Sequence, residues 1–179
     1  EEHEVEALSE RQSLLYVDRI FLHERTGSVA LNSLLEHGHS VRQQQHAFCT
    51  MDHIVDTRPG RSDDTLMPSG RDFIVATRSA AHETGIQLFD IQDPNQGIVH
   101  VISPELGIAL PGLSVICPDS HTCTLGGLGV LAWGVGSTEA EHALATSTLR
   151  VTRPKTMRVQ FVGRMPKHVT AKDLILYTI

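Results

Sequence analysis

The 179-residue sequence has no long apolar run and no excess of positive charge. A membrane-spanning helix needs roughly 18 or more consecutive apolar residues, and no segment approaches that length, so we do not expect a membrane protein. The 15 lysines and arginines are outnumbered by 21 acidic residues, which gives a formal net charge of −6. Binding to nucleic acid requires a concentrated basic face, and we find none. The composition therefore favours a small-molecule ligand.

Cysteine is also scarce. The three cysteines, Cys49, Cys117 and Cys123, occur in a chain whose first residues, EEHEVEALSE, lack the cationic and apolar leader of a secreted protein. Secretion and a disulfide framework are both disfavoured, so we expect a reducing, cytoplasmic location. Zinc binding by Cys117, His121 and Cys123 is disfavoured too, because the C-x3-H-x-C spacing lacks paired cysteines and a fourth ligand.

Three common nucleotide-binding or catalytic patterns are missing. The glycine-rich segment GGLGVLAWGVG (126–136) has neither the Walker A pattern nor the G-x-G-x-x-G pattern, so we do not expect a nucleotide site. Its small residues would instead allow close packing and let backbone N–H groups face an anion such as a carboxylate. Ser120 lies outside any G-x-S-x-G motif, and the adjacent His121 cannot readily fold back as its base, which disfavours a serine hydrolase.

Short apolar runs alternate with segments of helical periodicity along the chain. Strands are predicted at 14–18, 46–54, 86–90, 97–102, 113–117 and 157–162. Helices are predicted before Gly38, before Gly85, from the N-cap Ser103, over 137–149 from the N-cap Ser137, and after the N-cap Thr170. This alternation predicts a three-layer α/β/α fold with a mainly parallel sheet. One domain over 14–179, preceded by an acidic segment at 1–13, suits the chain length.

The segment 56–70 is rich in proline, glycine and aspartate, and we expect it to be a loop within the domain. Loops of this length are often functional. The chain stops in the apolar run DLILYTI, which would leave one face of its helix uncovered. We therefore expect the natural protein to continue past Ile179.

Imidazoles, acids and one hydroxyl occur at or just after predicted strands in four places. They are His23 and Glu24, Asp52 and His53, His100, and Asp119, Ser120 and His121. Since ligands bind at the carboxyl ends of parallel strands, we expect these side chains to meet at one rim of the sheet. Imidazole is suited to acid–base catalysis near neutral pH, and a carboxylate can fix its tautomer and raise its basicity. The remaining histidines are predicted to be caps or solvated residues.

Several longer motifs extend this pattern. They are LLYVDR (14–19), HERTG (23–27), TMDHIVDT (50–57), QGIVHVISPELGIALPG (96–112), PDSHTCTLGGLG (118–129) and GSTEAEHALATSTL (136–149). From about Leu14 to Ile179, in one order, they resemble the aconitase superfamily, and within it most closely the isopropylmalate isomerase branch of leucine biosynthesis. Several separate motifs in one order are more specific than any single short pattern.

The resemblance implies a hydro-lyase that dehydrates and rehydrates a hydroxy di- or tricarboxylic acid, assisted by a [4Fe–4S] cluster. It implies that His23 contacts the substrate and that Asp52 and His53 protonate the departing hydroxyl. His100 would lie near the metal-bound water. Asp119 and His121 would line the pocket, together with Ser120 as a substrate-binding residue.

The departures from the family pattern limit these expectations. The resemblance implies cluster ligands from one Cys and a later C-x-x-C pair, and no cysteine here has that pattern, so we expect no metal ligand and no cofactor on this chain alone. The remaining large-subunit domains and a separate small subunit would be its partners, and the chain would be inactive without them.

Other functions stay open. Ile54 stands where the leucine-pathway enzymes usually carry Asn, so citramalate, dimethylmalate or homoaconitate hydro-lyases remain alternatives. A remnant of the fold that has lost catalysis is another alternative. A mononuclear metal hydrolase that uses His53, His100 and His121 is a third.

Overall fold

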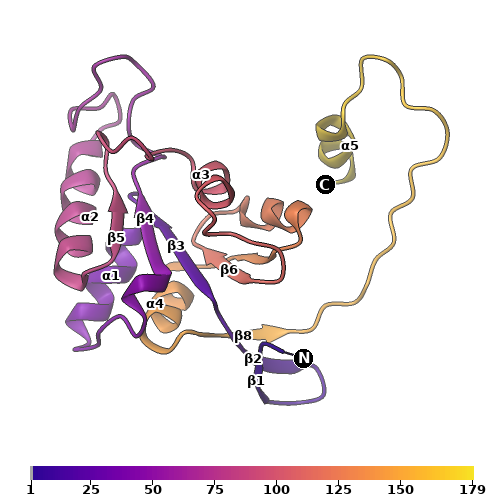
Figure 1. Ribbon diagram of the computed structural model, residues 1–179, viewed down its shortest axis with the longest axis horizontal. Helices are drawn as coiled ribbons and strands as arrows, with labels where there is room; N and C mark the ends of the chain where they lie inside the picture. The colour runs from indigo at the N-terminus through magenta and orange to yellow at the C-terminus, as the bar shows by residue number, and fades with distance from the viewer. Residues whose placement is uncertain (1) are drawn as a thin grey trace.

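The computed structural model describes residues 2–179 and has a parallel five-stranded sheet at its centre (Figure 1). The strands lie in the order β5 (Gln87–Phe89), β4 (Ala47–Thr50), β3 (Arg19–His23), β6 (Ser114–Cys117) and β7 (Leu131–Gly134). Each pair of neighbours is parallel. The central strands β3, β4 and β6 are almost wholly buried, as expected for a parallel sheet that is covered on both faces.

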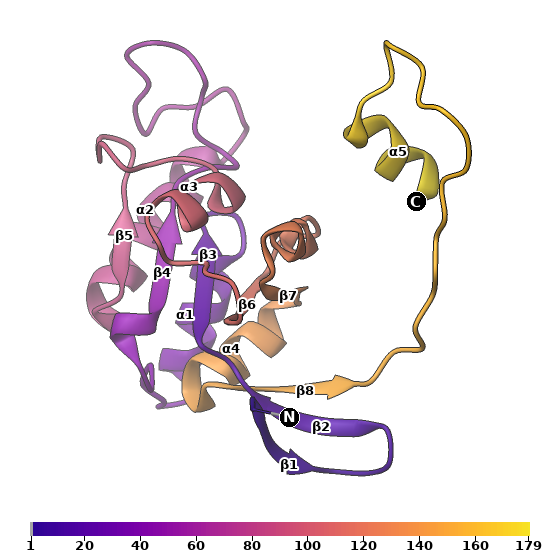
Figure 2. The ribbon, with the colours of Figure 1, turned by 45° about the vertical axis from the view of Figure 1, so that its right-hand side comes forward.

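Helices cover the two faces of this sheet (Figure 2). On one face lie α1 (Gly27–Glu36), α2 (Gly70–Thr84) and α4 (Ser137–Thr146), and on the other lie α3 (Val99–Glu105) and the 3-10 helix η2 (Thr122–Leu128). Successive side chains of a strand point to opposite faces, so Leu22 packs under α1 whereas Phe21 packs under α3. The predicted three-layer α/β/α fold is therefore confirmed.

A second, antiparallel sheet joins the two ends of the domain. It consists of β1 (Glu4–Ala7), β2 (Gln12–Tyr16) and β8 (Thr148–Thr152), with β2 in the middle. The acidic segment predicted at 1–13 thus contributes β1 and the start of β2. The predicted domain limits of 14–179 stay a prediction.

The buried strand predicted at 14–18 lies elsewhere. Residues 14–16 belong to β2, which is only half-buried, and the first strand of the central sheet is β3. Asp18 separates the two strands. Its carboxylate accepts hydrogen bonds from the backbone N–H and the hydroxyl of Ser114, at 2.8 and 2.9 Å. This contact turns the chain from the small sheet into the large one.

The predicted strand at 97–102 is instead the start of α3. Val99 and Ile102 lie three residues apart and both pack on the phenylalanines of the sheet, which is helical spacing. Asp52 accepts a hydrogen bond from Val99 N–H at 3.0 Å and so satisfies a free donor at the start of this helix. Ser103 is consequently a buried residue inside α3 and not its N-cap.

Most of the other predicted strands and helices are confirmed, and some have different ends. The strand predicted at 46–54 is confirmed only over 47–50, as β4, because the chain leaves the sheet after Thr50 and residues 52–54 form a turn. The strands at 86–90 and 113–117 are confirmed as β5 and β6, and the helices that end near Gly38 and Gly85 are confirmed as α1 and α2. The helix at 137–149 ends earlier, because Ser147 adopts φ 56° and the chain enters β8, and its N-cap is Gly136.

The last part of the chain extends away from the body of the domain (Figure 1). Residues 157–162, predicted as a strand, are exposed and pair with no strand in the described chain, so they lack the partner that a strand requires. The helix α5 (Ala171–Thr178) is confirmed, with Asp173 accepting hydrogen bonds from the N–H and hydroxyl of its N-cap Thr170, both at 2.7 Å. Its residues have no buried side chain.

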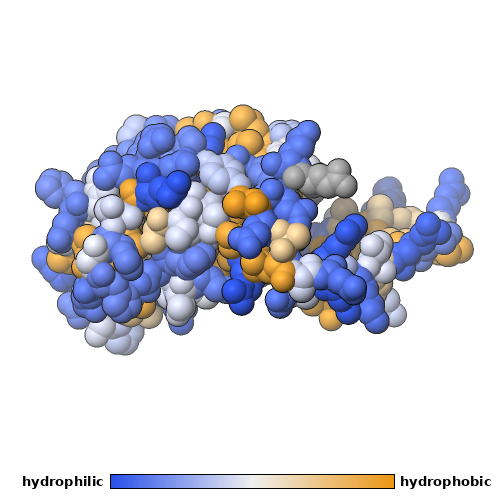
Figure 3. All heavy atoms as spheres, turned by 90° about the horizontal axis from the view of Figure 1, so that it is seen from below, coloured by the Kyte–Doolittle hydropathy of each residue, from blue (hydrophilic) through white to orange (hydrophobic). Residues whose placement is uncertain are grey.

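The molecular surface is mainly hydrophilic in the view from below, with apolar residues in small separate groups (Figure 3). Within residues 2–179, every helix is too short or too polar to cross a membrane.

Within the segment 126–136, Gly134 packs so closely against the backbone of Asp119 that a side chain would not fit. A Cβ atom at Gly134 would lie 2.5 Å from the backbone oxygen of Asp119, whereas one at Gly126 would meet nothing within 4 Å. We predict that Gly134→Ala lowers the free energy of unfolding by about 1–3 kcal/mol, as overpacking does. Gly126→Ala is the matched control and should change it far less in urea titrations. Equal effects of the two substitutions would contradict this close packing.

Candidate active site

Side chains from four parts of the chain meet beyond the carboxyl ends of β3, β4 and β6. His23 is the last residue of β3, Asp52 and His53 follow β4, and Asp119 follows β6. The carboxylate of Asp119 joins them, since its Oδ2 lies 2.9 Å from Nε2 of His53 and its Oδ1 lies 2.7 Å from Nε2 of His100. We predicted from the strand ends that these residues meet at one rim of the sheet. The structure places them together there.

The imidazole of His53 lies between two carboxylates. Its Nδ1 is 2.5 Å from Oδ1 of Asp52, and its Nε2 faces Asp119. An ionised carboxylate can only accept hydrogen bonds, so both ring nitrogens must carry protons and the ring is an imidazolium. The hydrogen bond with Asp52 and the charges of Asp52 and Asp119 outweigh partial burial and raise the pKa of His53 to about 9. His53 is therefore a charged proton donor at neutral pH, and its side chain is 30% exposed.

Asp119 is the complementary anion. Burial alone would raise its pKa, but the hydrogen bonds from His100 and from the backbone N–H of His121, with the charge of the imidazoles, lower this pKa to about 2. The side chain is 9% exposed. Asp119 thus keeps its negative charge and holds two imidazoles from different elements.

His23 is a neutral neighbour of His53. The two rings are stacked, with centroids 3.8 Å apart and planes 13° apart. Burial, followed by the positive charge of His53, lowers the pKa of His23. Its Nε2 donates to the backbone oxygen of Pro118 at 3.0 Å, which fixes the tautomer, and its buried Nδ1 has no partner among the described residues. One ring of the stack is charged and the other is not, so the stack avoids repulsion between like charges.

His100 reaches the site from α3 and not from a strand, which corrects the predicted position. Asp52 links this helix to His53, because Oδ1 contacts the imidazole while Oδ2 accepts the N–H of Val99, the residue before His100. The hydrogen-bonded chain from Asp52 through His53 and Asp119 to His100 is therefore continuous.

Ser120 and His121 lie at the open edge of this network. The side chain of His121 is 80% exposed, and its Nδ1 is 3.7 Å from Oδ1 of Asp119 and 3.2 Å from the hydroxyl of Ser120. Both side chains can therefore contact a ligand that covers the site.

Glu24 is the site residue that was missing from the predicted catalytic and binding set. Its carboxylate is fully buried and accepts the backbone N–H groups of Asp52 at 2.9 Å, His53 at 2.8 Å and Ile54. The available sequence signal was an acid directly after His23, at the end of a buried strand. Which backbone groups it would bind could not be read from the sequence.

The residues of this site do not form an evident metal centre. His23, Glu24, Asp52 and His53 each offer one ligand atom, and these atoms lie within 4.8 Å of one another. However, three N–H groups already engage the carboxylate of Glu24, and both nitrogens of His53 are protonated, so His53 has no lone pair for an ion and Glu24 has little acceptor capacity left.

The cysteines do not fit an iron–sulfur cluster. A cluster is held by thiolates, but Cys49 in β4 and Cys117 in β6 are buried, and burial raises the pKa of both thiols well above the ordinary value. Cys123 is exposed on η2.

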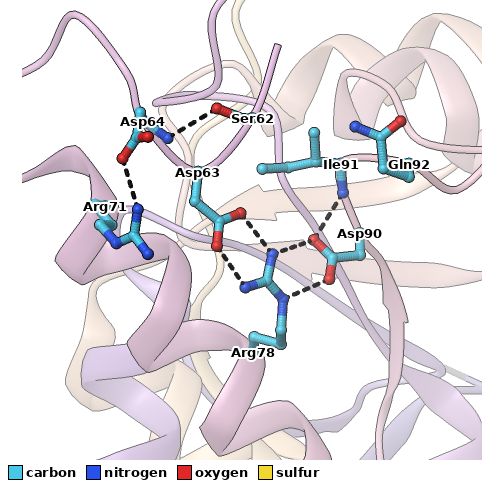
Figure 4. Close-up of a pocket in the computed structure, with 8 residues that line it drawn as sticks. All are labelled: Ser62, Asp63, Asp64, Arg71, Arg78, Asp90, Ile91 and Gln92. Carbon is cyan, nitrogen blue, oxygen red and sulfur yellow. Dashed lines mark hydrogen bonds and ion pairs between the residues drawn. The ribbon is translucent and has the colours of Figure 1, made fainter. Parts of the chain in front are cut away.

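A separate pocket lies where the loop 56–70 meets α2 and β5 (Figure 4). Arg78 on α2 binds Asp63 of the loop with two hydrogen bonds of 2.9 Å, and it binds Asp90 after β5 at 2.6 and 3.0 Å. The guanidinium and carboxylate groups are paired with one another, so this pocket anchors the loop and contains none of the predicted site residues.

Comparisons with known proteins show the family of this chain. The family model described as "Aconitase family (aconitate hydratase)" matches residues 1–179. The chain is 49% identical, over all 179 residues, to "3-isopropylmalate dehydratase large subunit 1" of Bradyrhizobium diazoefficiens. It spans 37% of the length of that relative.

The charge of His53 predicts a dependence of stability on pH. Its pKa rises from 6.5 to about 9 on folding, so the stabilisation is fully present below pH 6.5 and is lost as the pH rises to about 9. We expect the free energy of unfolding to fall over this window, and to fall less in His53→Gln. Urea titrations at several pH values test this, and parallel curves for the two proteins would contradict it.

Proposed function

Because the chain belongs to the aconitase family, we propose that it forms one side of the active site of a hydro-lyase. The reaction is the isomerisation of a hydroxy dicarboxylic acid by dehydration and rehydration. The name of the Bradyrhizobium relative makes the interconversion of 3-isopropylmalate and 2-isopropylmalate, a step of leucine biosynthesis, the first candidate. The observation that carries this proposal is the partly exposed imidazolium of His53, held between Asp52 and Asp119.

In this proposal His53 supplies the proton that dehydration requires. A hydroxyl group leaves readily only as water, so a positioned acid must protonate it as the carbon–oxygen bond breaks. The imidazolium donates the proton on Nε2, keeps the proton on Nδ1 that Asp52 holds, and becomes a neutral imidazole. In the rehydration step the same nitrogen takes a proton from the incoming water. Asp52 keeps the ring oriented throughout by holding the proton on Nδ1, whereas the hydrogen bond from Nε2 to Asp119 gives way to the substrate hydroxyl during proton transfer. Asp119 orients the charged ring before this transfer, and His100 keeps Asp119 in place.

Two of the remaining site residues, Ser120 and His121, bind the substrate in this proposal. His121 and Ser120 are exposed beside Asp119, where they can donate hydrogen bonds to a substrate carboxylate. His23 forms the buried wall behind His53 and, being neutral, does not compete with it as an acid. The group that removes the proton from carbon is not assigned to this chain.

The complete enzyme requires more than these residues. Enzymes of this family generally use a [4Fe–4S] cluster, and the three cysteines described above do not fit one. We therefore propose that the cluster ligands lie in the remaining part of a longer large subunit. A separate small subunit would complete the site, and the 179 residues alone would be inactive. A cytoplasmic location stays a prediction.

Ile54 does not favour a different substrate. Its side chain is 4% exposed and packs in the core with Met51, Ile74 and Ile91, so it points away from the rim. The hydrolase alternative loses support because His53 and His100 are both bound to Asp119. Citramalate, dimethylmalate and homoaconitate belong in the panel of substrates to be tested.

We predict that His53→Gln lowers kcat by about 10²–10⁴-fold, as loss of a general acid does, while KM changes little. The assay uses the complete large subunit that contains this chain, with its small subunit and cluster. His142→Gln is the control, because His142 lies on α4 and contacts Thr148 instead of the site. Full activity of His53→Gln would show that His53 is not the proton donor, whereas the non-catalytic alternative requires that the unmodified protein itself shows no activity in this assembly.

A further inference from the structure

We infer that Glu24 is a positioning residue, whose buried carboxylate fixes the turn at residues 52–54 so that Asp52 contacts one nitrogen of His53 and the other nitrogen faces Asp119. The hydrogen bonds between Glu24 and the turn are sufficient evidence for the turn geometry. The effect of Glu24 on catalysis rests on the proposed hydro-lyase function. Glu24 itself is too deeply buried to touch a substrate, so it acts through the two residues that it holds.

Three consecutive N–H groups converge on this one carboxylate. Oε2 accepts the N–H of Asp52, and Oε1 accepts the N–H groups of His53 and Ile54. No lysine or arginine forms an ion pair with Glu24 within residues 2–179. A buried anion is costly without such donors, and backbone N–H groups of successive residues form a natural anion-binding concavity. The turn and the carboxylate therefore stabilise each other.

The negative charge of Glu24 also acts on the imidazole of His53. The titratable groups around this imidazole are Asp52 from its own turn, Asp119 from the turn after β6, and His23 and Glu24 from the end of β3. Three of these four groups are acids, and the negative charge of Glu24 contributes to the raised pKa of His53. Glu24 thus influences the site in two ways, through the backbone of the turn and through its charge.

The backbone of Glu24 is held from the opposite side. The hydroxyl of Thr77, buried on α2, donates to the backbone oxygen of Glu24 at 3.1 Å. Removal of this hydroxyl weakens the contact between α2 and the end of β3, while the carboxylate of Glu24 keeps its three N–H donors. Thr77→Val therefore serves as a matched control for effects on stability alone.

The test compares Glu24→Gln, Glu24→Asp and Thr77→Val in the full protein. In Glu24→Gln the side chain keeps its size, loses its charge and presents an NH₂ group to backbone donors. We expect the NMR titration midpoint of His53 to fall by about one pH unit and kcat to fall about tenfold or more, with KM changed less than about threefold. Glu24→Asp retains the charge, so its midpoint should lie nearer to that of the unmodified protein. Thr77→Val should lower stability and leave the midpoint unchanged.

The outcomes separate a positioning role from a structural one. If Glu24→Gln lowers stability as Thr77→Val does but leaves the His53 midpoint and kcat unchanged, the inference is wrong. If Glu24→Gln does not fold, Glu24→Asp decides, since a carboxylate shortened by one methylene must shift the midpoint or kcat if position matters. If the unmodified enzyme shows no hydro-lyase activity, the proposed function fails, and the His53 midpoint still decides the role of Glu24.

Discussion

The carboxylate of Asp119 is the contact on which the arrangement of the site depends. It accepts hydrogen bonds from His53, which follows β4, from His100 on α3, and from the backbone of its own turn. These elements belong to different layers of the fold, so one anion ties the sheet to the helix above it. The absence of a side chain at Gly134 lets β7 pass directly against the backbone of Asp119, and the position of the carboxylate is thereby set by the packing of the sheet.

Charge balance within the site explains the different states of its two stacked imidazoles. His53 has acids at both nitrogens and is charged, whereas His23 is buried against a backbone oxygen and is neutral. Asp52 and Glu24 are both placed by backbone N–H groups. The helix α3 and the 52–54 turn are therefore as necessary to the acid–base properties of His53 as the carboxylates themselves.

The layers of the fold and the meeting of the site residues could be predicted from the sequence because both follow from local patterns. Buried parallel strands are continuous apolar runs, and polar residues after such runs share one rim. The start of α3 was mistaken for a strand because a run of six mostly apolar residues at 97–102 suits either structure. The strand β3 was missed because its division from β2 depends on a distant contact between Asp18 and Ser114. The role of Glu24 was missed because its partners are backbone groups, which carry no sequence signature.

The loop 56–70 is held at its start and in its middle by different kinds of bonds. Its start adjoins the turn held by the buried Glu24, and its middle is tied by the partly exposed pairing of Arg78 with Asp63, which Arg78 shares with Asp90. Between these two anchors Arg61 contacts Gln96 through its side chain and accepts a hydrogen bond from the Gln92 side chain through its backbone oxygen. Salt screens exposed ion pairs far more than buried contacts, so high ionic strength loosens the middle of this loop before it disturbs the histidine pair.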